Sequence, residues 1–216
     1  MNLQTDKQIE KEETLVIRDN MNAVERALKR LADILGSVIG IVLSSPLFLV
    51  ISIRLWFKNE GSVIFRQERI GLGGKPFNIY KFRTFLVEAE SEGPCLAPEN
   101  NGKLTSYGKF LRERHLDELP QLWNVLKGDM SIVGPRPERK YFIDKIMRHD
   151  ENYKYIYLMR PGLTSEATLK NGYTDTMEKM LRRLHMDLNY LQTRSLCVDF
   201  RIIFLTVRMI VSGKKF

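Results

Sequence analysis

The most constraining feature of this 216-residue chain is a run of twenty residues without a charge, from Ile34 to Ile53. A straight helix of that length would be about 30 Å long, enough to cross the hydrocarbon core of a bilayer. A cleaved signal peptide does not fit, because a long polar segment precedes the run and no small-residue cleavage site follows it. The sequence therefore predicts a membrane helix over about residues 24–57.

The centre of this run contains Ser44, Ser45 and Pro46. Proline removes a backbone donor and biases the preceding residue away from helical angles, whereas a serine hydroxyl can donate to a carbonyl that such a break frees. Basic residues flank the run on both sides, and positive charge favours the cytoplasmic face. Two geometries remain open: a helix-break-helix hairpin that enters and leaves by the same face, or a kinked spanning helix. The flanking bases are Arg26, Lys29 and Arg30 before the run, and Arg54 and Lys58 after it.

The rest of the chain alternates between short strand patterns and helical patterns. Residues 1–20 are acidic and are expected to be a disordered or loosely ordered lead, and residues 21–216 to form a single domain. Residues 61–85 alternate apolar and polar around GLGGKP, which predicts a β-hairpin. Residues 92–105 are expected to be a loop, and residues 106–129 two helices divided near Asp117. A short strand and turn are expected over residues 130–140, and helices over residues 141–158 and 175–192 with a loop between them.

A second membrane element is predicted at the C-terminus, over about residues 196–212. On a helix, Arg201, Arg208 and Ser212 fall on one side and the apolar residues mostly elsewhere. This pattern is typical of an interfacial helix, although a buried core helix is the alternative. The predicted fold class is therefore α+β and mainly helical, with one small β-hairpin and membrane-associated helices.

The charge balance predicts a polyanionic partner but does not identify it. The chain has 34 Lys and Arg against 26 Asp and Glu, a formal net charge of +8. Nucleic acid, anionic lipid and nucleotide phosphates all suit such a surface. The two cysteines and three histidines are too dispersed to suggest a zinc site.

Asp117 and Glu118 form an acidic pair within a basic stretch, just before a predicted helix with Pro120 in its first turn. The ordinary interpretation is that Asp117 caps this helix. The alternative is chemical: a helix start favours a bound phosphate, and Asp is a known nucleophile toward phosphorus. The two carboxylates could then share Mg²⁺ with substrate phosphates.

Basic residues that could neutralise a transferring phosphoryl group are abundant. Each one alone could equally be a solvated surface base. Arg136 stands out because it lies between Pro135 and Pro137, which stiffen the turn and orient the guanidinium for a bidentate phosphate contact. GLGGKP lacks the spacing of a Walker motif and is read as a hairpin turn. The other candidates are Arg66, Arg69, Lys81, Arg83 and Arg112.

The segments FRQERIG, KPFNIYKFRTF, FLRERHLDELPQLWNVLKGDMSIVGPRPE and RPGLT resemble the bacterial sugar transferases, the small monotopic phosphoglycosyl transferases. The similarity extends from about residue 25 to the C-terminus. It implies transfer of a sugar-1-phosphate from a UDP-sugar to polyprenyl (undecaprenyl) phosphate, with release of UMP. Asp117 would be the nucleophile, Glu118 would complete the dyad, and both would bind Mg²⁺. Lys81, Arg83, Arg112 and the turn Pro135-Arg136-Pro137 would bind substrate.

The resemblance also implies a location and a membrane topology. Ser45 and Pro46 match the break of a re-entrant helix, which favours the hairpin geometry and an active site on the cytoplasmic face of the bacterial inner membrane. The expected partners are the nucleotide sugar, the polyprenyl carrier and membrane lipids, with no nucleic acid. No long transmembrane region precedes the core, so we expect a minimal form of the family.

Departures from the family pattern limit what the resemblance implies. Residues 160–175 read RPGLTSEATLKNGYTD, where many relatives continue into a different segment, so the sugar is left open. Two rival functions also remain. A membrane-bound phosphohydrolase could use the same dyad on nucleotide sugars, and a basic membrane-surface binding module would need Asp117 only as a helix cap.

Overall fold

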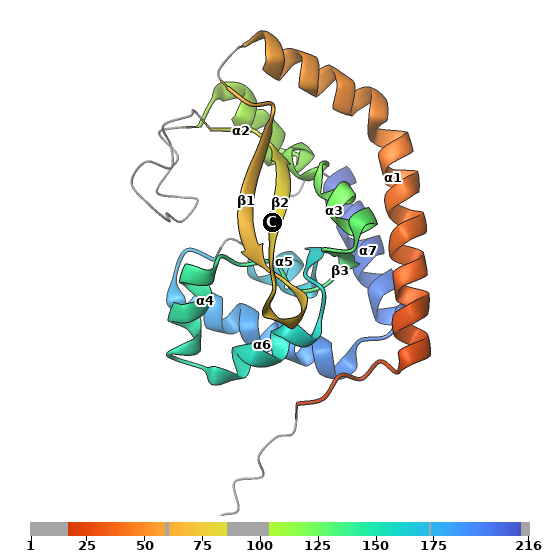
Figure 1. Cartoon of the computed structure of the whole chain (residues 1–216), viewed down its shortest axis with the longest axis vertical. Helices are drawn as coiled ribbons and strands as arrows, with labels where there is room; N and C mark the ends of the chain where they lie inside the picture. Colours follow the sequence, from red (N-terminus) through yellow and green to blue (C-terminus); the bar gives the residue numbers. More distant parts are fainter. Residues whose placement is uncertain (1–16, 59–60, 86–103, 173, 213–216) are drawn as a thin grey trace, which may run out of the picture.

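The computed structural model describes residues 17–58, 61–85, 104–172 and 174–212. Within these ranges the protein is mainly helical, with two small two-stranded sheets. In Figure 1 a central hairpin stands between one long helix along the right and top of the view and a group of helices at the bottom. The predicted mainly helical α+β class is confirmed, while most of the predicted 92–105 loop lies outside the described residues.

The long helix is α1, Ala23–Phe57, which contains the entire uncharged run. It begins with a capping box, in which Asn22 accepts from the Glu25 amide and Glu25 accepts from the Asn22 amide. The helix continues through Pro46, and Figure 1 shows that it bends between its lower and upper parts. Ser45 Oγ donates to the Val42 carbonyl at 2.8 Å, the acceptor four residues before Pro46 that the proline cannot reach. The expected serine compensation is therefore present without a break in the helix.

The predicted β-hairpin is confirmed. Strands β1, Ile64–Ile70, and β2, Pro76–Phe82, pair antiparallel with Ile64 opposite Phe82 and Ile70 opposite Pro76. The connection is a short 3₁₀ turn, η1, Leu72–Gly74, in which Gly73 and Gly74 have positive φ. These left-handed conformations explain why glycines occupy the turn.

The polar body is built from short elements that follow the hairpin. The predicted division of residues 106–129 into two helices is confirmed, with α2, Ser106–Glu113, and α3, Gln121–Lys127, on either side of the 3₁₀ turn η4, Leu116–Glu118. Residues 141–158 form two helices, α4, Lys140–Met147, and the 3₁₀ helix η5, Glu151–Leu158, because Asp150 starts a new helix by accepting from the Asn152 amide. The last two helices are α6, Met177–Thr193, and α7, Leu196–Val211.

The segment expected to be a loop before α6 contains regular structure. Strand β4, Gly162–Thr164, pairs in parallel with β3, Ser131–Val133, and α5, Glu166–Asn171, starts at a Ser165 cap. Strand β3 confirms the short strand predicted at the start of residues 130–140, whereas β4 was not predicted, because three residues are too few to show an alternating pattern.

The largest hydrophobic cluster lies among α4, η5, α6 and the start of α7, around Ile143, Leu191 and Ile202. A second cluster joins the C-terminal part of α1 to β2 and α2 through Ile51, Leu55 and Phe82. The N-terminal part of α1 packs on β3 and α3, where Gly36 faces Ile132 and Gly40 faces Leu122. Both ends of α1 are thus fixed to the same body.

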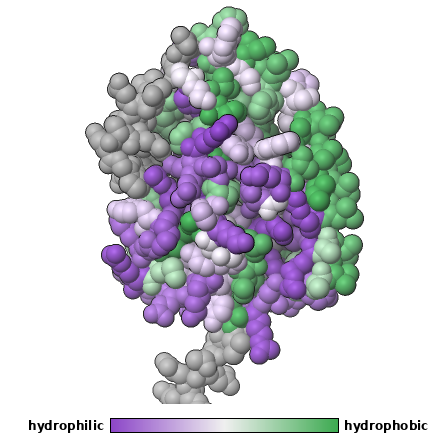
Figure 2. Space-filling model, viewed as in Figure 1, coloured by the Kyte–Doolittle hydropathy of each residue, from purple (hydrophilic) through white to green (hydrophobic). Residues whose placement is uncertain are grey.

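The opposite face of α1 is apolar and exposed. In Figure 2 hydrophobic side chains gather along the right edge and top of the molecule, over α1, while hydrophilic ones cover the centre. By length and composition, α1 is the one helix among the described residues that could cross a membrane, and only 11% of its apolar window is buried. Helix α7 adds a second exposed apolar row, formed by Leu196, Phe200, Phe204, Val207 and Ile210.

The described end of the predicted acidic lead, residues 17–20, is packed against the body. Ile17 belongs to the main hydrophobic cluster, the Asn20 amide donates to the Leu191 carbonyl, and Asp19 binds Arg194 at 2.6 Å. The lead as a whole stays a prediction, since residues 1–16 lie outside the described ranges.

Candidate active site

Asp117 and Glu118 lie in η4, between α2 and α3. His115 begins this turn with a φ of 55°, a left-handed conformation that is costly for a side chain other than glycine and often marks a functional segment. Helix α3 begins at Gln121 with Pro120 at its cap position, and that cap makes no side-chain hydrogen bond. The interpretation of Asp117 as the helix cap is therefore wrong, because the 3₁₀ turn places it outside α3.

Glu118 is held by two cations that come from distant parts of the chain. Lys81 Nζ, on β2, lies 2.6 Å from Glu118 Oε1, and Arg136 Nη2 lies 3.2 Å from the same oxygen. Burial alone would raise the pKa of Glu118, but Lys81 and Arg136 outweigh burial and hold that pKa well below its ordinary value. Glu118 is therefore a fixed anion.

Asp117 is buried, with 7% of its surface exposed, beside this cluster. Burial raises its pKa, and the negative charge of Glu118 raises it further, while Lys81, Arg112 and Arg136 oppose the shift. The three cations favour the ionised form of Asp117, which is the form that can attack phosphorus, against the net rise in its pKa.

The turn that carries Arg136 is fixed from several sides. It leaves β3 after Val133, and the Gly162 amide donates to the Pro135 carbonyl at 2.8 Å. Arg69 of β1 donates to the Pro137 carbonyl at 3.3 Å. Glu138 lies between Arg69 at 3.6 Å and Arg183 of α6 at 3.0 Å. The stiff turn expected from its two prolines is thus also tied to the hairpin and to α6.

The remaining predicted substrate-binding residues surround the dyad less directly. Arg112 lies in the last turn of α2 with its guanidinium 5.0 Å from the centre of the Phe85 ring, and its charge opposes the rise in the pKa of Asp117. Arg83 directly follows β2 and is buried. The structure therefore brings Lys81, Arg112 and Arg136 together with the dyad, whereas Ser45 and Pro46 lie within α1.

The chain is similar to known proteins over most of its length. The model of the family described as bacterial sugar transferase matches residues 24–213. A UDP-N-acetylgalactosamine-undecaprenyl-phosphate N-acetylgalactosaminephosphotransferase of Aeromonas hydrophila is 39% identical over 86% of this chain and 44% of its own. A UDP-glucose:undecaprenyl-phosphate glucose-1-phosphate transferase of Klebsiella pneumoniae is 41% identical over 87% of this chain and 41% of its own.

The chain belongs to the bacterial sugar transferase family. It spans less than half the length of the two relatives above. A glucose-1-phosphate transferase of Caulobacter vibrioides is covered more fully, with 40% identity over 83% of this chain and 68% of the relative. Family membership and the long apolar helix α1 together indicate membrane association.

One residue that joins the parts of this candidate site was missed by the sequence analysis. Asn124 of α3 is fully buried, and its amide binds the edge of β2 that faces away from β1. The Tyr80 amide donates to Asn124 Oδ1 at 3.1 Å, and Asn124 Nδ2 donates to the Asn78 carbonyl at 2.7 Å. Asn124 therefore fixes the strand that carries Lys81 to the helix that follows the dyad. The available signal in the sequence was an amide side chain between two apolar residues, Trp123 and Val125, in a short predicted helix.

The dyad suits a hard divalent cation that is shared with a substrate. No cluster of three or more His, Cys, Asp or Glu side chains that could hold a metal occurs among the described residues. Mg²⁺ does not need one, since it is commonly held by one or two carboxylates together with substrate phosphates and water. The two adjacent carboxylates supply oxygen donors of the kind that Mg²⁺ prefers, so the residue types present fit this ion.

Proposed function

We propose that this protein transfers a sugar-1-phosphate from a UDP-sugar to polyprenyl phosphate, releases UMP, and passes through a covalent intermediate on Asp117. The supporting observation is the buried Asp117 beside a Glu118 that Lys81 and Arg136 hold, in a chain of the bacterial sugar transferase family. The similar proteins of Aeromonas hydrophila and Klebsiella pneumoniae have names that describe transfer from UDP-sugars to undecaprenyl phosphate. Such an activity belongs to the transferases of substituted phosphate groups and starts glycan assembly on a lipid carrier.

In the first step an Asp117 carboxylate oxygen attacks the phosphorus that bears the sugar. The new bond is an acyl phosphate, the bond from that phosphorus to the bridging oxygen breaks, and UMP leaves with the bonding electrons. The equatorial oxygens carry the developing charge, so Lys81, Arg112 and Arg136 are placed to stabilise it.

In the second step a phosphate oxygen of the polyprenyl carrier attacks the same phosphorus. The acyl phosphate bond breaks and Asp117 returns as a carboxylate, which yields polyprenyl diphosphate sugar. Asp117 and Glu118 would hold Mg²⁺, which would supply neutralisation of the diphosphate charge. The relay suits a soluble donor and a lipid acceptor, because UMP leaves before the acceptor enters.

We further propose that α1 is re-entrant and that the active site lies on the cytoplasmic face of the bacterial inner membrane. Supporting this, the N-terminal part of α1 binds β3, while Ile51 and Leu55 pack against Phe82 and the α2 residues. A helix with both ends on one polar body cannot place them on opposite sides of a bilayer. The apolar rows of α1 and α7 would then lie in lipid, with α7 in the interface plane.

The test uses the purified chain in detergent or nanodiscs with polyprenyl phosphate, Mg²⁺ and a panel of UDP-sugars. We expect UMP release that depends on one donor class and on the lipid acceptor. Asp117→Asn should abolish it, and mass spectrometry after rapid quenching should detect a phosphosugar adduct on Asp117. Absence of UMP release with every donor would refute the function, and turnover without any adduct would refute the covalent step.

The same assay separates the rival functions. A phosphohydrolase would cleave the nucleotide sugar at an undiminished rate without polyprenyl phosphate. A membrane-surface binding module would bind vesicles and release no nucleotide, and Asp117→Asn would leave vesicle binding unchanged.

A further inference from the structure

The first three turns of α1 carry polar side chains that point into the protein. Lys29, Arg30 and Asp33 precede the uncharged run, where basic residues were read as a signal of membrane topology. In the structure, the Lys29 side chain is only 12% exposed and Asp33 is 4% exposed. Charged groups that have lost most of their hydration need specific partners, so a role in topology alone does not explain this burial.

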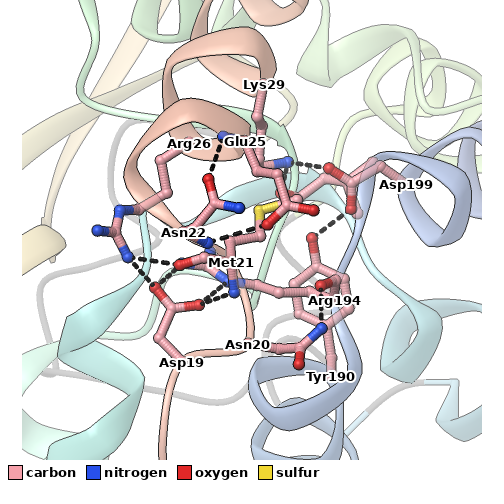
Figure 3. A network of polar contacts seen from close by, with 11 residues as sticks. Asp19, Asn20, Met21, Asn22, Glu25, Arg26, Lys29, Tyr190, Arg194 and Asp199 are labelled. Atoms are coloured by element: carbon pink, nitrogen blue, oxygen red, sulfur yellow. Dashed lines mark hydrogen bonds and ion pairs between the residues drawn. The ribbon is translucent and has the colours of Figure 1, made fainter.

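Lys29 contacts two elements that lie beside α1, the strand β3 and the helix α7. Its Nζ donates to the Val133 carbonyl at 2.9 Å and to Asp199 Oδ2 of α7 at 2.5 Å. The Tyr190 hydroxyl of α6 donates to the other oxygen of Asp199 at 2.5 Å. Figure 3 shows Lys29, Asp199 and Tyr190 in this order, with Arg26 and Asp19 on the other side of the helix start.

Val133 is the last residue of β3, three positions before Arg136. The Lys29 ammonium therefore fixes the strand end from which the turn with Arg136 departs. Asp33 holds the same strand one step earlier, since its Oδ1 accepts from the Ile132 amide at 2.9 Å and from the Ser131 hydroxyl at 3.1 Å.

Arg30 makes the equivalent contact to the helix that follows the dyad. Its guanidinium donates to the Val125 carbonyl at 2.6 Å and to the Leu126 carbonyl at 2.8 Å, at the C-terminal end of α3. The start of α1 thus contacts both the strand before Arg136 and the helix after Glu118.

We propose that Lys29 is a positioning residue that couples the placement of α1 to the geometry of the Arg136 turn. When α1 lies in the membrane and α7 lies beside it, Lys29 and Asp199 hold the end of β3, and Arg136 reaches Glu118. The kinetic consequence rests on the proposed function, whereas the structural consequence does not. In this proposal, the placement of α1 in the membrane also places Arg136 against Glu118.

The test removes the contact without leaving a buried charge. The double variant Lys29→Met with Asp199→Asn deletes both charges, keeps the side-chain volumes similar, and preserves an acceptor for the Tyr190 hydroxyl. Replacement of a buried ion pair by neutral groups is often tolerated, so the double variant should fold. The matched control is Arg26→Met, one turn earlier, whose half-exposed side chain binds Asp19 and the Met21 carbonyl.

Two measurements are made in nanodiscs, UMP release and amide hydrogen exchange of peptides that cover residues 130–138. For the double variant we expect kcat to fall by about 10-fold to 100-fold, the range for a misplaced catalytic group, with a change of less than about threefold in the KM for the UDP-sugar. Exchange in residues 130–138 should rise in the double variant and stay at the wild-type level in the control.

The proposal would be overturned if the double variant kept both the wild-type kcat and the wild-type exchange in residues 130–138. It would also be overturned if Arg26→Met lowered kcat as much as the double variant does. If the double variant does not fold, Asp199→Asn alone serves, because it weakens the hold on Lys29 and keeps the acceptor for Tyr190. It should raise the same exchange, and unchanged exchange would overturn the proposal. A wild-type protein that releases no UMP would refute the proposed function instead, and the exchange measurement would remain decisive for Lys29.

Discussion

Asn124→Ala is expected to disrupt the site by separating β2 from α3, although Asn124 is not expected to touch substrate. The substitution removes the acceptor of the Tyr80 amide and the donor to the Asn78 carbonyl. Both backbone groups lie at the edge of β2, on the strand that carries Lys81. Lys81 would then lose its fixed distance from Glu118.

The magnitude follows from these two backbone groups. A buried donor or acceptor left without a partner costs about 1–3 kcal/mol, so two of them cost about 2–6 kcal/mol of unfolding free energy. Lys127→Ala is the matched control, because Lys127 and Asn124 donate to the same oxygen of Asp129, each at 3.2 Å. Lys127 is solvent-exposed, so its removal should cost less than about 1 kcal/mol.

The assay combines denaturant unfolding in detergent with UMP release under conditions where each variant is folded. Asn124→Ala should lower both the unfolding free energy and kcat, and Lys127→Ala should change neither appreciably. If the unfolding free energies of Asn124→Ala and Lys127→Ala differ by less than about 1 kcal/mol, the Tyr80 amide and the Asn78 carbonyl find other partners and the reasoning is refuted.

Three further predictions concern charge. Lys81→Met should move the acid limb of kcat/KM to higher pH, because Lys81 opposes the raised pKa of Asp117, and an unmoved limb in the pH profile would contradict this. Burial raises the pKa of Asp187 to about 7. The unfolding free energy of the wild type, measured as a function of pH, should therefore fall relative to that of Asp187→Asn between about pH 4 and 7, by up to about 4 kcal/mol. Parallel stability curves for the two proteins would disprove this prediction. Chelation of Mg²⁺ should stop UMP release and leave the circular dichroism spectrum unchanged, whereas full activity in chelator would exclude the metal.

The elements that local patterns determine were predictable from the sequence. The hairpin follows from alternation around glycines that adopt positive φ, and α6 and α7 begin at Thr176 and Ser195, whose hydroxyls cap them. The dyad and the Arg136 turn were identified because unusual residue types lie together in the chain.

Contacts between distant segments could not be read from the same patterns. Lys29 has the sequence context of a topology signal, but the fold buries it against Val133 and Asp199. Asp117 has the context of a helix cap, but it lies inside the 3₁₀ turn η4, and Pro120 occupies the cap position of α3. In each case the local pattern permits two outcomes and the packing of another segment decides between them.

The parallel contact of β3 with β4 restricts which substitutions this part of the chain can accept. A Cβ atom at Gly162 would overlap the backbone of Gly134, and one at Gly134 would overlap the Arg160 carbonyl oxygen, so neither glycine tolerates a side chain. The distinctive segment from Ser165 onward starts just beyond this contact. Substitutions in residues 165–172 that keep the Ser165 cap and the buried Ala167 can therefore test whether this segment selects the sugar, while Gly134 and Gly162 stay unchanged.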